Sequence, residues 1–351
     1  MTKSQINSQS ENNKHPLLVF LHLVFGIYLL FGICILVFPP RSAEAQALPA
    51  PVSIVASPPA PSPGEAVAVT AATPSFDRHT AYFTWVVDGR QRPDLSGTGK
   101  NSIELTAGNV GSSQRVAVSV SRKNGGTGVA GGEAVLTIRV ADLTLTYTAE
   151  TWTPVWYRGK ALPVPDATIG IIAIPDFVVD GRRIPPERLI YRWGLDDEHN
   201  ALSGIGEQVF RIRASDMPGT SHEVKVRVED EDGKVRKEGV FYVVPHTPRL
   251  VIYNSSPLGG IEFRTAERFS GGRGLFDFVA EPFFFPVAGR NDLAWEWQVD
   301  GRPFAANAGT PHIITVDTGG YPEGQLSVTA GVQIPGSFLS RASAILAFFL
   351  Q

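Results

Sequence analysis

Two clusters of acidic residues are the groups in this sequence that come closest to a metal site. They are Asp196-Asp197-Glu198 and Glu229-Asp230-Glu231-Asp232. Calcium takes about six to eight oxygen ligands from such side chains, but neither cluster has the spacing of an EF-hand loop. Short acidic runs are also common at the solvated tips of hairpins. The sequence therefore favours hairpin tips and predicts no metal site, while a calcium site shared between neighbouring loops stays open.

A glycine pattern, Gly126-x-Gly128-x-x-Gly131, matches the dinucleotide-binding fingerprint by letter. That fingerprint places a pyrophosphate at the N-terminus of a helix that follows a strand. Here a run with strand character, residues 134–140, follows the glycines instead. The pattern therefore predicts a flexible hairpin loop and no cofactor site.

The remaining polar residues give no recognisable catalytic set. No Gly-x-Ser-x-Gly elbow occurs, and the single cysteine, Cys34, lies in the most apolar stretch of the chain. Asn254-Ser255-Ser256 matches a glycosylation sequon, which we interpret as a chance match. No two histidines have the spacing of a zinc-binding helix, so we expect surface or edge positions for His15, His22, His79, His199, His222, His246 and His312. We expect no enzyme, although a catalytic set built from distant loops stays open.

Two aromatic segments supply the candidate binding residues. One lies in the Pro-rich residues 151–166 and the other between two prolines, where irregular backbone can present rings to a sugar or a peptide. The candidates are Trp152, Trp156, Tyr157, Phe283, Phe284 and Phe285. Packing in a core or between domains is the favoured alternative, because large aromatic side chains carry much of the burial in a β-sandwich.

Composition and charge exclude some classes of function. The chain has 351 residues, of which 43% are hydrophobic and 19% charged, so it can form two or three folded domains. Its 31 basic and 34 acidic residues give a net charge of −3. Such a balance provides no excess of positive charge with which to bind nucleic acid.

The N-terminal region carries the features of an export signal. Residues 17–38 are uncharged and apolar, and a helix of this length would cross a hydrocarbon layer of about 30 Å. The small-x-small pattern Ala43-Glu44-Ala45, which a signal peptidase reads, follows Pro39-Pro40. Residues 1–45 are therefore predicted to be a signal peptide or a membrane anchor, with cleavage after Ala45 favoured. Either outcome places residues 46–351 outside the cytoplasmic membrane.

The rest of the chain has the pattern of an all-β protein. After an Ala/Pro-rich stalk at residues 46–63, which overlaps a first strand near residues 52–55, short runs alternate apolar and polar residues between Gly, Pro, Asn and Asp. The clearest predicted strands are residues 66–70, 81–87, 115–120, 134–140, 143–148, 224–228, 239–244, 294–299, 313–316 and 326–330.

These runs repeat three times. An aromatic-x-Trp motif recurs, and its two rings must lie on one buried face because side chains alternate along a strand. The predicted core pairs are Phe83 and Trp85, Tyr191 and Trp193, and Trp295 and Trp297. In the first and third copies Asp-Gly follows and supplies the turn of a tight hairpin. From each tryptophan the next core strand begins 31, 31 and 29 positions later, at Val116, Val224 and Leu326. The predicted domains are residues 51–140, 141–245 and 246–351.

The chain resembles immunoglobulin-like β-sandwiches that lack the intersheet cysteine pair. The shared features are a tryptophan on a central strand, short strands and units of about a hundred residues. In the second domain, Tyr191-x-Trp193 and the later Val224-x-Val226-x-Val228 run are similar to the polycystic-kidney-disease (PKD) type of bacterial surface sandwich. The resemblance implies an exported bacterial protein with three tandem immunoglobulin-like domains after an N-terminal membrane-inserting helix. It implies roles in spacing, adhesion or ligand presentation, and no catalytic residues.

We therefore expect a non-catalytic surface or envelope protein that acts as a spacer, adhesion or protein-interaction module. The alternative is a carbohydrate-binding or accessory module that presents substrate to an enzyme. The expected partners are an envelope protein or a glycan, together with the membrane if residues 1–45 are not removed. The short junctions, Ala141-Asp142 and Pro245-His246-Thr247-Pro248, predict a stiff chain. In such a chain, the third domain or its junction with the second domain is expected to meet the partner.

Overall fold

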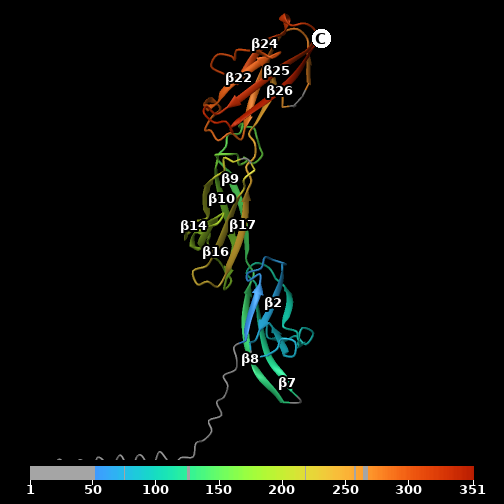
Figure 1. The fold of residues 1–351 in the computed structure, drawn as a ribbon, viewed down its shortest axis with the longest axis vertical. Coiled ribbons are helices and arrows are strands. Elements are labelled where there is room, and N and C mark those ends of the chain that lie inside the picture. Colours follow the sequence, from blue (N-terminus) through green and yellow to red (C-terminus); the bar gives the residue numbers. More distant parts are fainter. Residues whose placement is uncertain (1–51, 75, 125–126, 218, 257, 264–267) are drawn as a thin grey trace, which may run out of the picture. The chain divides into compact units, whose positions relative to one another are not determined.

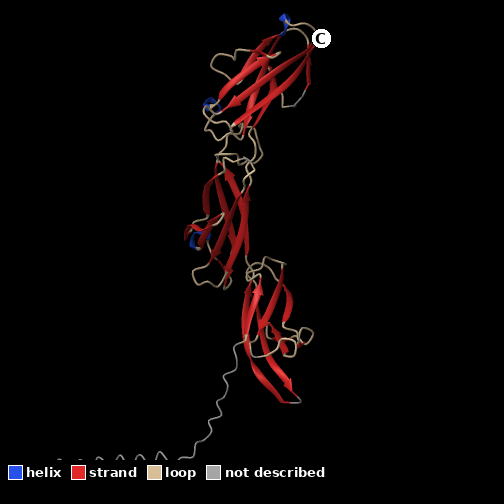
Figure 2. Ribbon diagram, viewed as in Figure 1, coloured by secondary structure: helices blue, strands red, loops and turns tan. Residues whose placement is uncertain are grey.

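The computed structural model describes residues 52–74, 76–124, 127–217, 219–256, 258–263 and 268–351. The predicted export signal, with its apolar segment 17–38, lies outside these residues. Within the described ranges, no helix is long and apolar enough to cross a membrane. The described residues are almost entirely strands and loops, with three short 3-10 helices (Figure 2).

The first domain contains two sheets. Its strands are β1 (Ser53–Ser57), β2 (Ala66–Ala72), β3 (Tyr82–Val87), β4 (Arg90–Gln91), β5 (Gly97–Thr98), β6 (Ser102–Thr106), β7 (Ser113–Asn124) and β8 (Thr127–Arg139). One sheet has the order β1-β2-β6, and the other has the order β4-β3-β7-β8 with β5 paired to β3.

The second domain repeats this arrangement. Its elements are β9 (Asp142–Ala149), β10 (Thr168–Asp176), β11 (Val178–Val179), β12 (Arg182–Arg183), η1 (Pro186–Arg188), β13 (Ile190–Leu195), β14 (Glu198–Ile205), β15 (Val209–Arg213), β16 (His222–Glu229) and β17 (Arg236–Val243). The main sheets are β15-β10-β9 and β14-β13-β16-β17, and β11 and β12 form a separate hairpin.

The third domain has the same two-sheet plan. Its elements are β18 (Arg249–Ser256), β19 (Gly260–Ile261), β20 (Arg268–Gly271), β21 (Leu275–Phe283), η2 (Arg290–Asp292), β22 (Ala294–Val299), β23 (Arg302–Pro303), β24 (Ile313–Asp317), η3 (Thr318–Gly320), β25 (Gly324–Gln333) and β26 (Arg341–Leu350). The sheets are β19-β18-β21-β24 and β20-β26-β25-β22-β23. The β20–β26 pair is parallel, whereas β22, β25 and β26 pair antiparallel.

Each domain is an immunoglobulin-like sandwich. In all three, the first, second and fifth core strands form one sheet, and the third, sixth and seventh form the other, which is the Greek-key order of that fold. Figure 1 shows the labelled strands of each domain in successive colours. The inward side chains of each pair of sheets form one apolar cluster per domain. The predicted all-β, three-domain fold class is confirmed for the described residues.

The three tryptophans of the repeat occupy equivalent places. Trp85, Trp193 and Trp297 are 0%, 0% and 4% exposed. Each indole N–H donates to a main-chain carbonyl 14 or 15 residues later, at distances of 2.9, 2.7 and 2.9 Å. Phe83 and Tyr191 are also fully buried, but Trp295 is only partly buried and packs at the margin of its core. In the third domain both rings of the pair thus contact the core, but only Trp297 is buried.

The turn after each tryptophan strand is built on an aspartate with positive φ. Asp88, Asp196 and Asp300 have φ angles of 51°, 50° and 54°. Each carboxylate accepts a hydrogen bond from the backbone N–H of the residue 27 positions later, at 2.8, 2.9 and 3.3 Å. This hydrogen bond connects the turn to the neighbouring strand. The need for its acceptor explains why aspartate recurs at this position of the repeat.

The strand register corrects one predicted spacing. Val87 pairs with Val116, Leu195 with Val224 and Val299 with Val328. The third interval from the tryptophan therefore ends at Val328, is 31 like the others, and does not end at Leu326. Leu326 is also a buried residue of the same strand face, so alternation alone did not distinguish the two.

Two further predictions hold only in part in the first domain. The glycine run belongs to a hairpin, as predicted, but Gly128 and Gly131 lie in its strand β8, paired with β7, and not in the loop; Gly126 lies outside the described residues. A Cβ atom on Gly131 would overlap the Phe76 ring, so this glycine serves packing. The predicted stalk also extends too far, because β1 begins at Ser53, and Ala60 and Pro61 are buried.

Candidate functional site at the junction of the second and third domains

The loop of residues 151–166 joins β9 to β10 and carries three of the candidate aromatic residues. Its backbone meets the third domain at Trp152, which forms an antiparallel bridge with Phe285. The Trp152 N–H donates to the Phe285 carbonyl at 2.6 Å, and the Phe284 N–H donates to the Trp152 carbonyl at 2.7 Å. The two domains are thus joined by main-chain hydrogen bonds as well as by the connecting chain.

The third domain contributes a sharp corner at the end of β21. Phe284 has a φ of +65°, which is unusual for a bulky residue. Such a conformation costs on the order of 1–3 kcal/mol and persists only where surrounding contacts hold it. The corner turns Phe285 into the third-domain core, while Phe283 and Phe284 join the apolar cluster of the second domain.

The rings at the junction form a contiguous aromatic cluster. Trp156 lies 5.7 Å from Phe283, 5.8 Å from Tyr253 and 4.6 Å from Phe263, measured between ring centroids. Tyr157 lies 5.6 Å from both Phe283 and Phe284. The edge-to-face geometry of most of these pairs is the favourable one for aromatic rings.

Burial corrects the candidate binding patch. Phe283, Phe284 and Phe285 are 7%, 4% and 0% exposed, so their rings cannot receive a ligand. Trp156 and Tyr157 are partly buried and face these rings. Four of the six candidates, Trp156, Tyr157, Phe283 and Phe284, therefore lie together as a packing surface between domains, and Phe285 lies in the third-domain core. Packing in a core or between domains is the alternative favoured for these residues. Sequence reasoning missed Tyr253 and Phe263, because each is isolated in the sequence.

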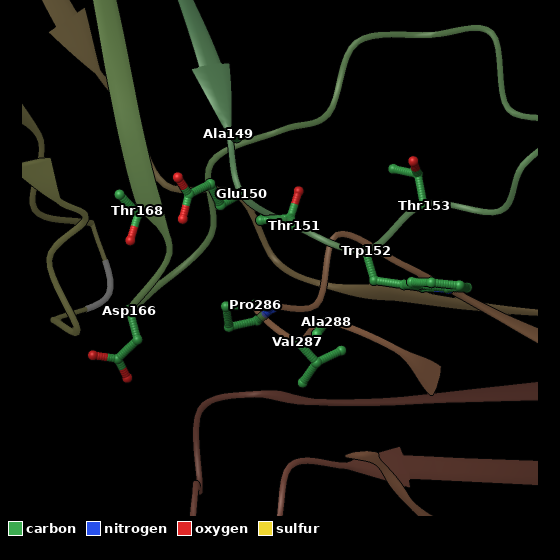
Figure 3. A pocket seen from close by; sticks show the side chains of 10 residues that line it. All are labelled: Ala149, Glu150, Thr151, Trp152, Thr153, Asp166, Thr168, Pro286, Val287 and Ala288. Carbon is green, nitrogen blue, oxygen red and sulfur yellow. The ribbon is translucent and has the colours of Figure 1, made fainter. Parts of the chain in front are cut away.

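Beside this cluster lies an open cleft of about 530 Å³. Its lining, shown in Figure 3, consists of Ala149, Glu150, Thr151, Trp152, Thr153, Asp166, Thr168, Pro286, Val287 and Ala288. Asp166 has a φ of +66° and an ion pair with Arg213 at 3.0 Å. The partly buried Trp152 has an indole nitrogen without a hydrogen-bond partner among the described residues. Hydroxyl groups, carboxylates and one indole can bind a neutral polar ligand, but they form no nucleophile–base pair.

Two buried titratable residues of the third domain lie near this junction. Glu281, two residues before Phe283 on β21, is 3% exposed and accepts a hydrogen bond from Arg290 at 3.0 Å. Burial raises the pKa of Glu281, although the Arg290 guanidinium opposes this effect. His312 is 7% exposed, and burial together with the charge of Arg290 lowers its pKa to about 4. His312 is therefore a neutral interior residue, which corrects its expected surface position.

The junction of the first and second domains is polar instead of aromatic. The Lys237 ammonium on β17 donates to the Ala60 carbonyl, the Ser62 hydroxyl and the Ala141 carbonyl at 2.9, 2.8 and 3.0 Å. Burial lowers the pKa of Lys237, while the nearby carboxylates of Glu65 and Asp142 oppose this effect. One ammonium thus satisfies three acceptors from two domains.

The acidic clusters have partners of their own. Asp196 accepts from His222 at 2.8 Å, and Asp232 pairs with Lys234 at 3.1 Å. Both clusters lie at hairpin turns, as predicted, but Asp230 is buried and accepts from the Val235 N–H at 2.7 Å. Among the described residues, no three His, Cys, Asp or Glu side chains are placed to hold a metal ion. Asn254 of the sequon lies within β18.

No family model and no curated protein matches the chain. Among solved structures, the three N-terminal domains of the bacteriophage RB49 highly immunogenic outer capsid protein (Hoc) are 12% identical, with a TM-score of 0.24, over 87% of this chain and 99% of that one. The central fibronectin-III array of RIM-binding protein is 14% identical, with a TM-score of 0.28, over 86% and 98%. SGBP-B of the Bacteroides ovatus mixed-linkage glucan utilization locus, in complex with a mixed-linkage heptasaccharide, is 10% identical, with a TM-score of 0.22, over 83% and 65%. Similarity at this level transfers no function.

Proposed function

We propose that this chain is a non-catalytic, exported surface or envelope protein whose domains act as a spacer and protein-interaction module. Export rests on the apolar segment 17–38 and the Ala43-Glu44-Ala45 pattern. The PKD-like character of the second domain and a bacterial source belong to the same proposal. The observation that carries the spacer role is the aromatic junction between the second and third domains.

The junction supports this role because the second domain is incomplete without the third. Phe283 and Phe284 belong to the apolar cluster that also contains Tyr191 and Trp193. Separating the domains would expose these rings together with Trp156, and each buried aromatic side chain contributes on the order of 2–3 kcal/mol by its burial. A chain whose domains only needed to be tethered would not require such contacts.

Calorimetry of the full chain in detergent tests the coupling. Trp156→Ala should lower the unfolding temperatures of both the second and the third domain, because the ring packs against residues of the third. Val155, its neighbour in the loop, is 98% exposed, so Val155→Ala serves as the matched control and should leave both transitions in place. A Trp156→Ala chain whose second and third domains unfold as in the wild type would contradict the coupling.

Export has a separate test. Mass spectrometry of the full-length gene product from a membrane fraction and from the medium should find a chain that begins at Gln46 or one that retains residues 1–45 in the membrane. A protease added to intact cells should remove a C-terminal epitope tag. A full-length cytosolic chain would exclude export while leaving the junction measurements unaffected.

A second candidate function, carbohydrate binding, is favoured by the cleft beside the junction. Threonine hydroxyls and carboxylates next to an indole are suitable partners for sugar hydroxyls and sugar faces. A glycan array probed with the full chain tests this. Trp152→Ala should weaken any binding at least about tenfold, or about 1.4 kcal/mol, and Val155→Ala should not. An array without bound glycans, or binding unchanged by Trp152→Ala, would reject the candidate.

A further inference from the structure

The side of β18 and β21 that faces away from the third-domain core carries a buried carboxyl group, that of Glu281. Side chains alternate along a strand, and Ile252 and Ala280 point into that core. Val251 and Glu281, their neighbours in the sequence, therefore point to the other side. The register forms three adjacent pairs on this side: Arg249 with Phe283, Val251 with Glu281, and Tyr253 with Val279.

The second domain covers this side of the sheet. Val251 and Phe283 pack against the apolar cluster of the second domain. The Trp156 ring lies 5.7 Å from the Phe283 ring and 5.8 Å from the Tyr253 ring, measured between centroids. The pair of Glu281 with Val251 lies between the pairs that contain these two rings, and Glu281 is only 3% exposed. Glu281 is therefore part of the aromatic junction.

The Glu281 carboxyl group is only half paired. Its Oε1 accepts a hydrogen bond from the Arg290 guanidinium at 3.0 Å, whereas its buried Oε2 has no hydrogen-bond partner among the described residues. The Arg290 side chain is 35% exposed, so water weakens its attraction for the carboxylate. An ionised carboxylate buried in this way is costly, whereas a protonated one brings no charge into the aromatic surroundings.

The other charged groups on this side of the sheet lie at the ends of the strands. Arg249, beyond the Glu281 pair, is exposed. Asp277, at the opposite end, accepts a hydrogen bond from the Thr315 hydroxyl at 2.6 Å. Neither residue has a described contact with Glu281.

Two further titratable groups of the third domain are neutral between pH 5 and pH 8. Burial raises the pKa of Tyr253, and the charge of Glu281 adds to this effect. Burial and the charge of Arg290 lower the pKa of His312 to about 4. Proton binding in this range therefore leaves Glu281 as the buried group of this face that changes its charge.

The covering loop of residues 151–166 has its charged groups engaged elsewhere or in solvent. Lys160 donates to the Thr146 hydroxyl at 2.9 Å, and Asp166 pairs with Arg213 at 3.0 Å. Arg158 is exposed. The loop thus covers Glu281 with aromatic rings and supplies no described ion pair to it.

We propose that Glu281 makes the junction of the second and third domains sensitive to pH, so that the junction is tight while this carboxyl group is protonated and opens more readily once it is ionised. The proton comes from the solvent and binds at Oε2, the oxygen without a partner. Separating the domains lets water reach the carboxyl group, so the open junction accommodates the charge without the cost of burial.

The direction of the effect follows from burial. Burial raises the pKa of Glu281 in the closed junction, although Arg290 opposes this effect. The closed junction therefore holds the proton more tightly than the open one. Its extra stability is fully present below the ordinary value of 4.5 and is lost as the pH rises through the raised value. A spacer with such a junction is stiffest in mildly acidic surroundings.

The pH sensitivity requires the aromatic junction of the proposed function, and hydrogen exchange of the full chain in detergent measures how that junction opens. The Phe284 N–H donates to the Trp152 carbonyl at 2.7 Å, so the protection factor of this amide falls when the domains separate. The protection factor is the suitable quantity because it is corrected for the intrinsic pH dependence of exchange. In the wild type it should be at least about threefold higher at pH 5 than at pH 8, since a difference of one between the pKa values of the closed and open states changes the opening constant about tenfold.

A neutral replacement isolates the carboxyl group. Glu281→Gln carries no charge at any pH and should be equally well protected at pH 5 and pH 8. Glu296→Gln, on the exposed side of β22, is the matched control and should keep the pH dependence of the wild type.

A second variant gives a different pH profile. Arg290→Met removes the guanidinium that opposes the effect of burial on the Glu281 pKa. The midpoint of the pH dependence should therefore move to a higher pH, which a purely structural role of Arg290 would not cause.

Trp156→Ala distinguishes failure of the pH sensitivity from failure of the junction. It should lower the Phe284 protection factor at least about tenfold at pH 5. If it does so while the wild type is equally protected at both pH values, while Glu281→Gln keeps the wild-type difference, or while Arg290→Met leaves the midpoint in place, the junction stands and the role of Glu281 is overturned. If Trp156→Ala leaves the protection unchanged, the junction is refuted together with its pH sensitivity.

Discussion

The neutral interior histidine of the third domain makes stability depend on pH. His312 has a pKa of about 4 in the folded chain and an ordinary value of 6.5, so the unfolded chain takes up a proton first as the pH falls. Stability is therefore fully present above pH 6.5 and is lost as the pH falls towards 4. At about 1.4 kcal/mol per pH unit, the full loss is about 3 kcal/mol, and about 2 kcal/mol is already lost at pH 5.

Glu281 acts in the opposite direction over part of this range. Burial raises its pKa, so its contribution to stability is present at low pH and is lost as the pH rises through the ordinary carboxylate range and above. A pH titration of the wild type alone would mix the two effects. The difference between the wild type and His312→Phe isolates the histidine, because Glu281 is present in both chains.

The assay is urea unfolding of the full chain in detergent at pH 7 and pH 5, with pulsed hydrogen exchange and mass spectrometry of β24 and β25 peptides to resolve the third domain. The wild type should lose about 2 kcal/mol more than His312→Phe between these pH values. His222→Phe, which alters a histidine of the second domain, should leave the third-domain result unchanged. An equal loss in the wild type and in His312→Phe would refute the assignment of His312 as a buried neutral group.

Two further predictions concern the repeat and the first junction. Trp85→Ala, Trp193→Ala and Trp297→Ala should each destabilise their own domain by about 3–5 kcal/mol in domain-resolved unfolding, since truncating a buried aromatic leaves a cavity; a near-neutral change at any of the three would break their equivalence. Lys237→Met should increase hydrogen exchange and proteolysis near Ala141, because three acceptors lose their shared donor. Lys225→Met, on the exposed sheet face, is the control and should increase neither. Equal effects of the two variants would contradict a role for Lys237 at the junction.

Residue patterns predicted the fold well because the determining signals are local. Alternation located the central strands, and the Trp-x-Val-Asp-Gly-Arg motif located the tryptophan strand and its turn in the first and third domains. Strand β10 was not among the clear predictions, because Ile169, Ile171 and Ile172 form a nearly continuous apolar run without alternation. Trp295 is only partly buried, although it is the second residue of its strand, as the fully buried Phe83 and Tyr191 are of theirs.

The junction was predictable only in part. The sequence identified Trp156, Tyr157 and the three phenylalanines as one class of residue, but it could not pair them, because the two segments lie more than a hundred positions apart. The positive φ of Phe284, which sends neighbouring rings into different cores, has no local sequence signal because the residue is not glycine. Burial of His312 and Glu281 likewise depends on tertiary packing and has no local sequence signal.

The central claim is that the second and third domains are held together by the aromatic junction. Pulsed electron–electron double resonance measures this directly in the full chain, since Cys34 is the only native cysteine and Cys34→Ser leaves two spin labels at Arg211→Cys on β15 and Arg302→Cys on β23. With labelled chains diluted in unlabelled ones, we predict one narrow distance distribution that broadens in Trp156→Ala and not in Val155→Ala. A broad distribution in the parent chain, or one that Trp156→Ala does not change, would contradict the claim.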